Sequence, residues 1–197
     1  ESLKELQENL EGYSPTAKEI LLKLEGSDIR AVPLAEILKP DASIEDHLEA
    51  LLGDDVNTLI VSKKTDAIDL SRLVNEKDLE RVRIFSVEDA RQAAVEAPKP
   101  IEGAESILTK VRVESDFEAV AKCWLGKVYI CRDADQLFQL RESHPDSVFL
   151  TNDSRTIAHA DRSLTSGNIP KKTGVFARRR EIEELEVVCS DLQNQLD

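Results

Sequence analysis

The sequence predicts an α/β (α+β) protein in which two related mixed α/β subdomains lie between two short coiled-coil stubs. Three observations predict this arrangement. Apolar residues recur at alternating spacings of three and four near both ends of the chain, which is the a/d period of a coiled coil. The middle contains the order helix, glycine, buried strand, helix twice, and a proline-rich connector separates the two occurrences.

The stubs cover residues 1–13 and 178–197. The seam of the incoming stub consists of Leu3, Leu6 and Leu10, and that of the outgoing stub consists of Ile182, Leu185, Cys189, Leu192 and Leu196. One stub leads toward the middle and the other leads away, so we expect antiparallel pairing within one chain. The alternative is two ordinary amphipathic helices that pack on their own domain, because two heptads are fewer than a coiled coil normally needs. The chain contains no methionine, and we expect it to be a segment of a longer protein.

The first subdomain is predicted over residues 14–96. Ser43 is positioned to cap an amphipathic helix that ends at Gly53. A strand is expected over 58–61, a second helix follows it, and β-forming residues return at 82–86.

A connector at 97–104 leads into the second subdomain, residues 105–177. Ser115 and Glu118 form a capping-box pattern for a helix that ends before the strand at 128–131. A further helix and two β-forming segments follow, at 147–150 and 155–158. We therefore interpret the middle as an internal repeat; chance recurrence of a common motif is the alternative.

Composition limits the possible functions. A chain of 197 residues with 41% hydrophobic content can form one domain or two small ones. A net charge of -13 and a pI near 4.8 exclude a protein that coats nucleic acid or anionic membrane with its whole surface, although local basic patches stay possible. No apolar run approaches the ~20 residues of a membrane span. Cys123, Cys131 and Cys189 lack metal-site or disulfide-framework spacing, as expected for a reducing cytoplasm.

Catalytic patterns are weak. The sequence contains no phosphate-binding glycine loop, no dinucleotide fingerprint and no metalloprotease helix. The three histidines, His47, His144 and His159, are widely separated, so we interpret them as structural or surface residues. Asp133 and Asp135 stand where a helix should begin, and carboxylates there typically cap the helix. We predict no catalytic residues, no metal site and no cofactor in this chain.

The chain resembles the hinge domain of bacterial structural-maintenance-of-chromosomes (SMC) proteins, the condensin-type ATPases. The resemblance extends over four segments: residues 10–21, 44–61, 117–153 and 163–185. The last one is the most specific, because it joins a glycine-containing loop to the first heptad of a coil.

The resemblance implies a dimer interface in this glycine-containing loop. The residues concerned are Ser163, Leu164, Thr165, Ser166, Gly167 and Gly174. Within this loop the chain departs from the family at two positions, since Arg162 and Ser166 stand where the family usually has glycine. Glycines there let two backbones approach closely, so these replacements affect the geometry or tightness of the dimer.

The densest basic cluster lies where the second subdomain meets the outgoing stub. It comprises Lys171, Lys172, Arg178, Arg179 and Arg180. Guanidinium groups can bind phosphate oxygens without reading bases, so we expect weak, sequence-independent DNA binding here. The alternative is that the arginines pair with acidic residues around the stub.

The resemblance implies a homodimerisation hinge that joins two coiled-coil arms of a chromosome-organising ATPase. Chromosome segregation and condensation, and a cytoplasmic, nucleoid-associated location, follow as expectations. ATP and Mg²⁺ are expected only at head domains that this chain lacks, and neither a membrane nor a small-molecule substrate is expected. The alternative function is an α/β sensor or adaptor module inserted in a signalling coiled coil, and a small-molecule enzyme ranks third.

Overall fold

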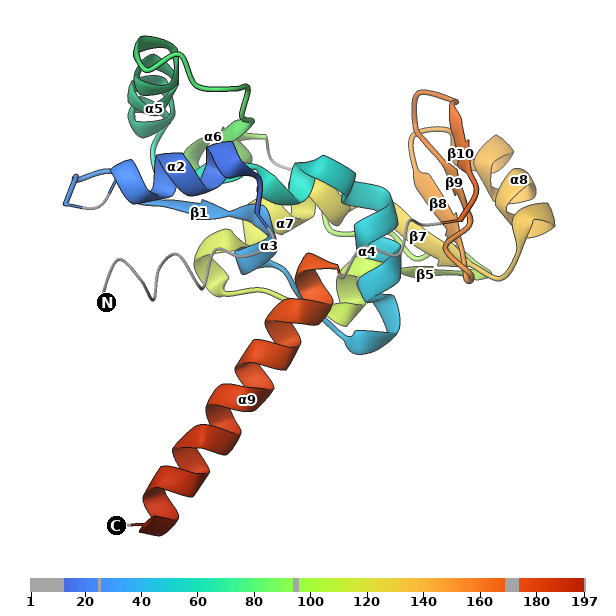
Figure 1. Cartoon of the computed structure of the whole chain (residues 1–197). Coiled ribbons are helices and arrows are strands. Elements are labelled where there is room, and N and C mark those ends of the chain that lie inside the picture. The colour runs from blue at the N-terminus through green and yellow to red at the C-terminus, as the bar shows by residue number, and fades with distance from the viewer. Residues whose placement is uncertain (1–12, 25, 94–95, 169–173, 197) are drawn as a thin grey trace.

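The computed structural model describes residues 13–24, 26–93, 96–168 and 174–196. Two α/β halves lie side by side, and the long last helix, α9 (Val175–Leu196), projects away from them (Figure 1). Residues 178–196 of the last predicted stub are therefore helical. The α/β class and the order of elements predicted from the sequence are confirmed.

The first half contains a three-stranded sheet of order β1-β3-β4. Strand β3 lies in the centre, antiparallel to β1 and parallel to β4, and all three of its residues are buried. Its strands are β1 (Ala31–Pro33), β3 (Leu59–Val61) and β4 (Ile84–Ser86). Its α-helices are α2 (Pro15–Lys23), α3 (Leu34–Ile37), α4 (Glu45–Leu52), α5 (Lys64–Glu76) and α6 (Val87–Gln92), and its 3₁₀ helices are η1 (Ala42–Ile44) and η2 (Gly53–Asn57).

The second half contains a five-stranded sheet of order β10-β9-β8-β7-β5. Its strands are β5 (Ala104–Ser106), β7 (Val128–Cys131), β8 (Val148–Thr151), β9 (Thr156–Ala158) and β10 (Leu164–Ser166). Its helices are η3 (Ile107–Lys110), η4 (Ser115–Phe117), α7 (Glu118–Leu125) and α8 (Ala134–Ser143). A separate two-stranded sheet joins the halves, formed by β2 (Lys39–Pro40) of the first and β6 (Val111–Arg112) of the second.

The predicted internal repeat is confirmed by strand register. Ala31 lies opposite Val61 in the first half, as Ala104 lies opposite Cys131 in the second. The parallel pairs correspond as well, β3 with β4 and β7 with β8. The halves also differ. The first half begins with α2, inserts η2 between α4 and β3, and follows β4 with α6, whereas the second half continues its sheet with β9 and β10.

The predicted side-chain caps at Ser43 and Ser115 are wrong. A 3₁₀ turn precedes each helix, so α4 begins at Glu45 and α7 begins at Glu118, and neither has a side-chain cap. Each serine lies inside the 3₁₀ turn, where it cannot take the extended backbone conformation that a capping residue needs.

The halves share a large hydrophobic core. It takes in α4, β3 and α6 from the first half together with α7 and one face of the five-stranded sheet from the second. Helices α6 and α7 pack against each other across the boundary. The other face of the larger sheet forms a separate small core with α8, whose buried residues are Ile101, Tyr129, Cys131, Leu137, Phe149 and Ala158. The domain boundaries given above stay a prediction.

Candidate functional site: the open sheet edge and the root of α9

Strand β10 forms an open edge of the larger sheet. All three of its residues are exposed, including apolar Leu164 with 46% of its surface accessible. His159 N donates to Ser163 O, and Gly167 N donates to Arg155 O, so the residues at 163, 165 and 167 bond toward β9. Backbone groups alternate along an antiparallel strand. The N–H and C=O groups of Leu164 and Ser166 therefore point away from the sheet.

The turn before β10 is fixed by local hydrogen bonds. The Asp161 carboxylate accepts bonds from the Ser163 backbone at 2.8 Å and from its hydroxyl at 2.6 Å. Arg162 has φ +70°, a left-handed conformation that favours glycine. Arg162 is the position where the resemblance expects glycine, so the glycine-type backbone is retained without the glycine. Gly167 has φ +140° and ends the strand.

Glu49 of α4 caps the N-terminus of α9. Its Oε1 atom accepts a hydrogen bond from Phe176 N at 3.1 Å. Burial raises the pKa of Glu49, while the backbone N–H groups of Phe176 and Val175 act to lower it. A Cβ atom at Gly174 would lie 2.6 Å from Glu49 Oε1 and 2.8 Å from its Cδ. Gly174 thus has a role within the chain, and its assignment to the dimer interface stays a prediction.

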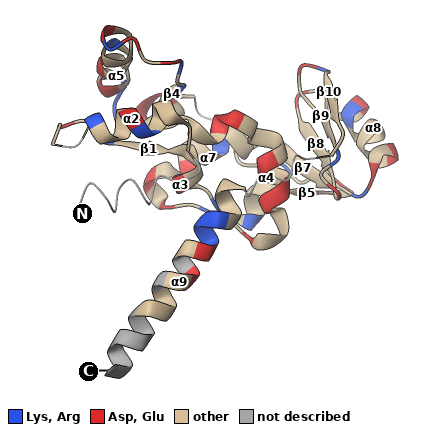
Figure 2. Cartoon of the chain, in the orientation of Figure 1, with Lys and Arg blue, Asp and Glu red and all other residues tan. Residues whose placement is uncertain are grey.

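Two of the three predicted DNA-binding arginines contact acidic residues of the first half. Arg180 Nε lies 2.8 Å from Oε1 of Glu45, a residue only 7% exposed. Arg179 Nε lies 3.4 Å from Glu36 of α3, and its Nη1 donates to Ala35 O at 2.8 Å. These contacts match the alternative of acidic pairing, and Figure 2 shows the basic root of α9 beside acidic residues of α3 and α4.

The remaining basic residues leave the DNA assignment a prediction. Arg178 is half-buried and also has an interaction partner. Lys171 and Lys172 lie outside the described residues. Tyr13 donates a hydrogen bond to Glu36, and burial together with this carboxylate raises the pKa of Tyr13. Residues from both ends of the described chain, Tyr13 and Arg179, therefore meet at Glu36.

The apolar surface of α9 is broad. Leu185 is 63% exposed, and Cys189 is exposed, whereas Ile182 is half-buried. Val187 and Val188 are also exposed, which the three-four spacing did not indicate. Leu3, Leu6 and Leu10 lie outside the described residues, as do the side chains of Leu192 and Leu196. Pairing of the two stubs stays a prediction.

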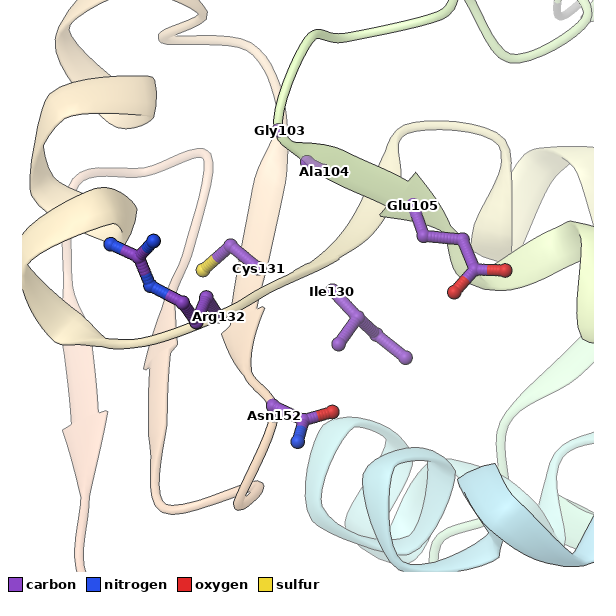
Figure 3. A pocket seen from close by; sticks show the side chains of 7 residues that line it. All are labelled: Gly103, Ala104, Glu105, Ile130, Cys131, Arg132 and Asn152. Atoms are coloured by element: carbon purple, nitrogen blue, oxygen red, sulfur yellow. The ribbon is translucent and has the colours of Figure 1, made fainter.

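A recess of about 520 Å³ lies beside β7 in the second half (Figure 3). Ile130 and Cys131 of β7 point to opposite sides of the sheet, toward the shared core and the small core respectively. Burial raises the pKa of the Cys131 thiol to about 11, so this thiol is protonated at neutral pH. Arg132 pairs with Asp133 at 2.7 Å, and Asp133 caps α8 by accepting from Gln136 N at 3.0 Å. The predicted capping role of Asp133 is confirmed.

Within the described ranges, no three His, Cys, Asp or Glu side chains group so that they could hold a metal ion. The same part of the chain contains no helix with the length and apolarity needed to cross a membrane.

Comparison with known proteins identifies the family. A family model described as the flexible hinge domain of SMC proteins matches residues 31–137, more than half of the chain. The match runs from the start of β1 into α8 and so includes most of both halves. The chain belongs to the SMC hinge family.

One relative is the chromosome partition protein Smc of Clostridium kluyveri. It is 21% identical over 196 residues, an alignment that spans 94% of this chain and 16% of the relative. The chain thus corresponds to about a sixth of that protein.

Solved structures share the fold. An SMC hinge domain from Geobacillus stearothermophilus, described as an asymmetric dimer, matches with a TM-score of 0.78 and 17% identity over 98% of this chain and 80% of that one. A Pyrococcus furiosus Smc hinge domain with an extended coiled coil matches with a TM-score of 0.64 and 17% identity over 98% of this chain and 73% of that one. The predicted hinge-type α/β fold is confirmed.

Sequence reasoning missed Glu49, Lys39 and Arg112 as residues of the α9 root. Glu49 lies 127 positions from Phe176, whose N–H it accepts. Lys39 and Arg112 become neighbours only because β2 pairs with β6. The acidic residues of the segment 45–49 indicated that it makes charged contacts, but the sequence did not identify the partners.

Proposed function

We propose that this chain is a homodimerisation hinge in which β10 of one copy pairs with the first half of a second copy. The observation that carries the proposal is the open edge of β10, where the backbone groups of Leu164 and Ser166 point outward and the side chains are exposed. An edge strand with unpaired backbone groups is a template for pairing with another chain.

The repeat indicates the receiving edge. Strand β8 is covered by β9, but its counterpart β4 is the last strand of its own sheet. Docking of β10 on β4 of a second copy would supply the neighbour that the first half lacks. A two-fold dimer contains this contact twice, which closes a ring. The description of the Geobacillus hinge domain as an asymmetric dimer supports dimerisation itself.

Ser166→Pro tests the edge. Proline removes the outward N–H of Ser166 without removing the bonds that residues 165 and 167 make to β9. We expect wild type to be dimeric at about tens of micromolar and the proline variant to dissociate at least ~tenfold more readily, measured by sedimentation velocity. The matched control is Ser166→Ala, which keeps the N–H and should stay dimeric. A monomeric wild type, or a proline variant as dimeric as the control, would contradict the proposal.

We further propose that the flanking coils continue into long arms that end in ATPase heads. The chain covers about a sixth of its Clostridium relative, which leaves length for such parts. The relative's description as a chromosome partition protein supports a role in chromosome organisation on the nucleoid. In this proposal ATP and Mg²⁺ bind at the heads, and dimerisation of the hinge needs neither.

Weak DNA contact at the α9 root is the second part of the proposal. Consecutive arginines at a helix start, in a chain of net charge -13, support it. Arg178→Ala leaves the pairs of Arg179 with Glu36 and of Arg180 with Glu45 in place. Arg178 has an interaction of its own, so the melting temperature of the variant is compared with that of wild type. We expect labelled duplex DNA to bind at roughly micromolar or weaker affinity at low salt, and the variant to weaken it. Unchanged anisotropy titrations would refute this part.

A further inference from the structure

A small basic recess lies where the β2–β6 pair meets the root of α9. Its volume is about 220 Å³, and its lining includes four cationic side chains, Lys39, Arg112, Arg179 and Arg180, with one carboxylate, Glu45. The cations come from the first half, the second half and the last helix. Such convergence of positive charge is unusual in a chain whose net charge is -13.

Two of these cations face each other directly. Lys39 on β2 is the register partner of Arg112 on β6, so both side chains lie on one face of the pair. Both residues are exposed, and neither has an acidic partner within the described part of the chain. Like charges directly opposite on paired strands are destabilising. An anion between them would convert this repulsion into attraction.

The repeat explains why the two charges meet. Lys39 and Arg112 occupy equivalent places in the two halves, since each lies on the short strand that follows the first strand of its half. The β2–β6 pair therefore contains the approximate two-fold axis between the halves. A ligand on this axis would be contacted by the same kind of group from both sides.

The arginines of α9 are held at the wall of this recess. Glu45 binds Arg180 through both carboxylate oxygens, at 2.8 and 3.4 Å. Glu36 and the Ala35 carbonyl position Arg179. Because an arginine has five N–H donors, Arg180 can keep its Glu45 contact and still donate to a ligand.

We propose that this recess binds a compact, polyvalent oxyanion, namely a free phosphoryl or pyrophosphoryl group. Planar guanidinium groups match such oxygens in a bidentate way, and an ammonium group adds a point charge. Acidic residues lie close by: Glu45 lines the recess, Asp41 directly follows β2, and Glu184 lies 3.3 Å from Arg180. A duplex presents a continuous row of phosphates, which these carboxylates would repel, whereas one compact anion needs only the four cations of the recess. The proposal is independent of dimerisation through β10.

Calorimetric titration of the 197-residue chain with inorganic pyrophosphate at low ionic strength tests the site. We expect saturable binding by wild type and at least ~tenfold weaker binding by the double variant Lys39→Ala/Arg112→Ala. The matched control is Lys77→Ala/Arg81→Ala, which removes the same charge from exposed positions after α5 and should bind as wild type does. Without ligand, the double variant should melt no lower than wild type, because it removes a like-charge pair; pyrophosphate should raise the melting temperature of wild type only.

Three outcomes would overturn the proposal. The first is an absence of binding by wild type. The second is an equal loss of affinity in the control variant, which would reduce the effect to net charge. The third comes from competition with a short labelled duplex: DNA bound through Lys39 and Arg112 that pyrophosphate does not displace would assign the recess to the DNA backbone. Sedimentation of the same samples separates each of these outcomes from a failure of dimerisation.

Discussion

The two halves of this hinge repeat one topology, and helices α4 and α7 show how the copies have diverged. Both helices follow a 3₁₀ turn and both pack into the shared core. On α4, Glu45 and Glu49 reach across to the root of α9. At the corresponding positions of α7, Glu118 and Lys122 contact each other at 3.6 Å. The first half thus anchors the last helix, whereas the corresponding residues of the second half pair with each other within one helix.

The sheets have diverged in a complementary way. The first sheet stops at β4, and the second continues to the exposed β10. The second sheet also separates two cores, because α8 covers the face turned away from the first half. One half therefore has an uncovered sheet edge at β4 and the other has an exposed strand, β10, which is the division of roles that the proposed dimer requires.

The largest expected effect comes from the small core of the second half. Phe149 is fully buried there, while its counterpart in the first half, Ile84, is half-buried. Phe149→Ala should lower the free energy of unfolding by about 3–5 kcal/mol, and Ile84→Ala by about 1–2 kcal/mol, because less surface is lost. Urea denaturation measures both. Equal losses would mean that Phe149 and Ile84 contribute equally to the stability of their two sheets.

A middle-sized effect is expected where α4 anchors α9. Gly174→Ala forces the Glu49 carboxylate away from the helix N-terminus, at a cost of about 1–2 kcal/mol, the range for losing a cap. Glu49→Ala loses the same cap but leaves room for the new methyl group. The double variant should therefore cost less than the sum of the single variants in a denaturation cycle. If the losses of the two single variants simply added in the double variant, the role of Glu49 as the cap of α9 would be contradicted.

The smallest effect concerns the acid side of the stability curve. His47 on α4 is buried, and burial lowers its pKa below the usual 6.5, although the Asn152 backbone opposes the shift. The unfolded chain then takes up a proton near pH 6.5 that the folded chain refuses, so stability falls as pH falls below that value. At the corresponding position α7 has the apolar Val120, which is fully buried.

His47→Leu should remove this dependence. Its melting temperature should change less between pH 7 and pH 5 than that of wild type. Thermal melts followed by circular dichroism at both values measure the difference, with His144→Leu as the control, because His144 lies at the end of α8 and is exposed. If the melting temperature of the His47 variant fell between pH 7 and pH 5 as much as that of wild type, other groups would control the loss of stability in acid.

The fold could be predicted from local pattern because its elements are short and strongly signalled. The buried runs at 59–61 and 128–131 are strands, and the loop into the last helix carried the family resemblance. The contacts of the α9 root could not be predicted, because Arg179 meets Ala35 across 144 positions and Arg180 meets Glu45 across 135. Sequence spacing indicated that these arginines are clustered, but only the fold identifies the carboxylates that hold them.

The way α9 is fixed makes it a lever. The first turns of α9 make its contacts with the rest of the described chain. The partners in these contacts, Glu36, Glu45 and Glu49, all belong to the first half. A helix of 22 residues is about 33 Å long at 1.5 Å per residue. A tilt of roughly 10° at the root therefore displaces the far end by roughly 6 Å. Small rotations of the first half, produced by whatever docks on its sheet, would be magnified along the arm.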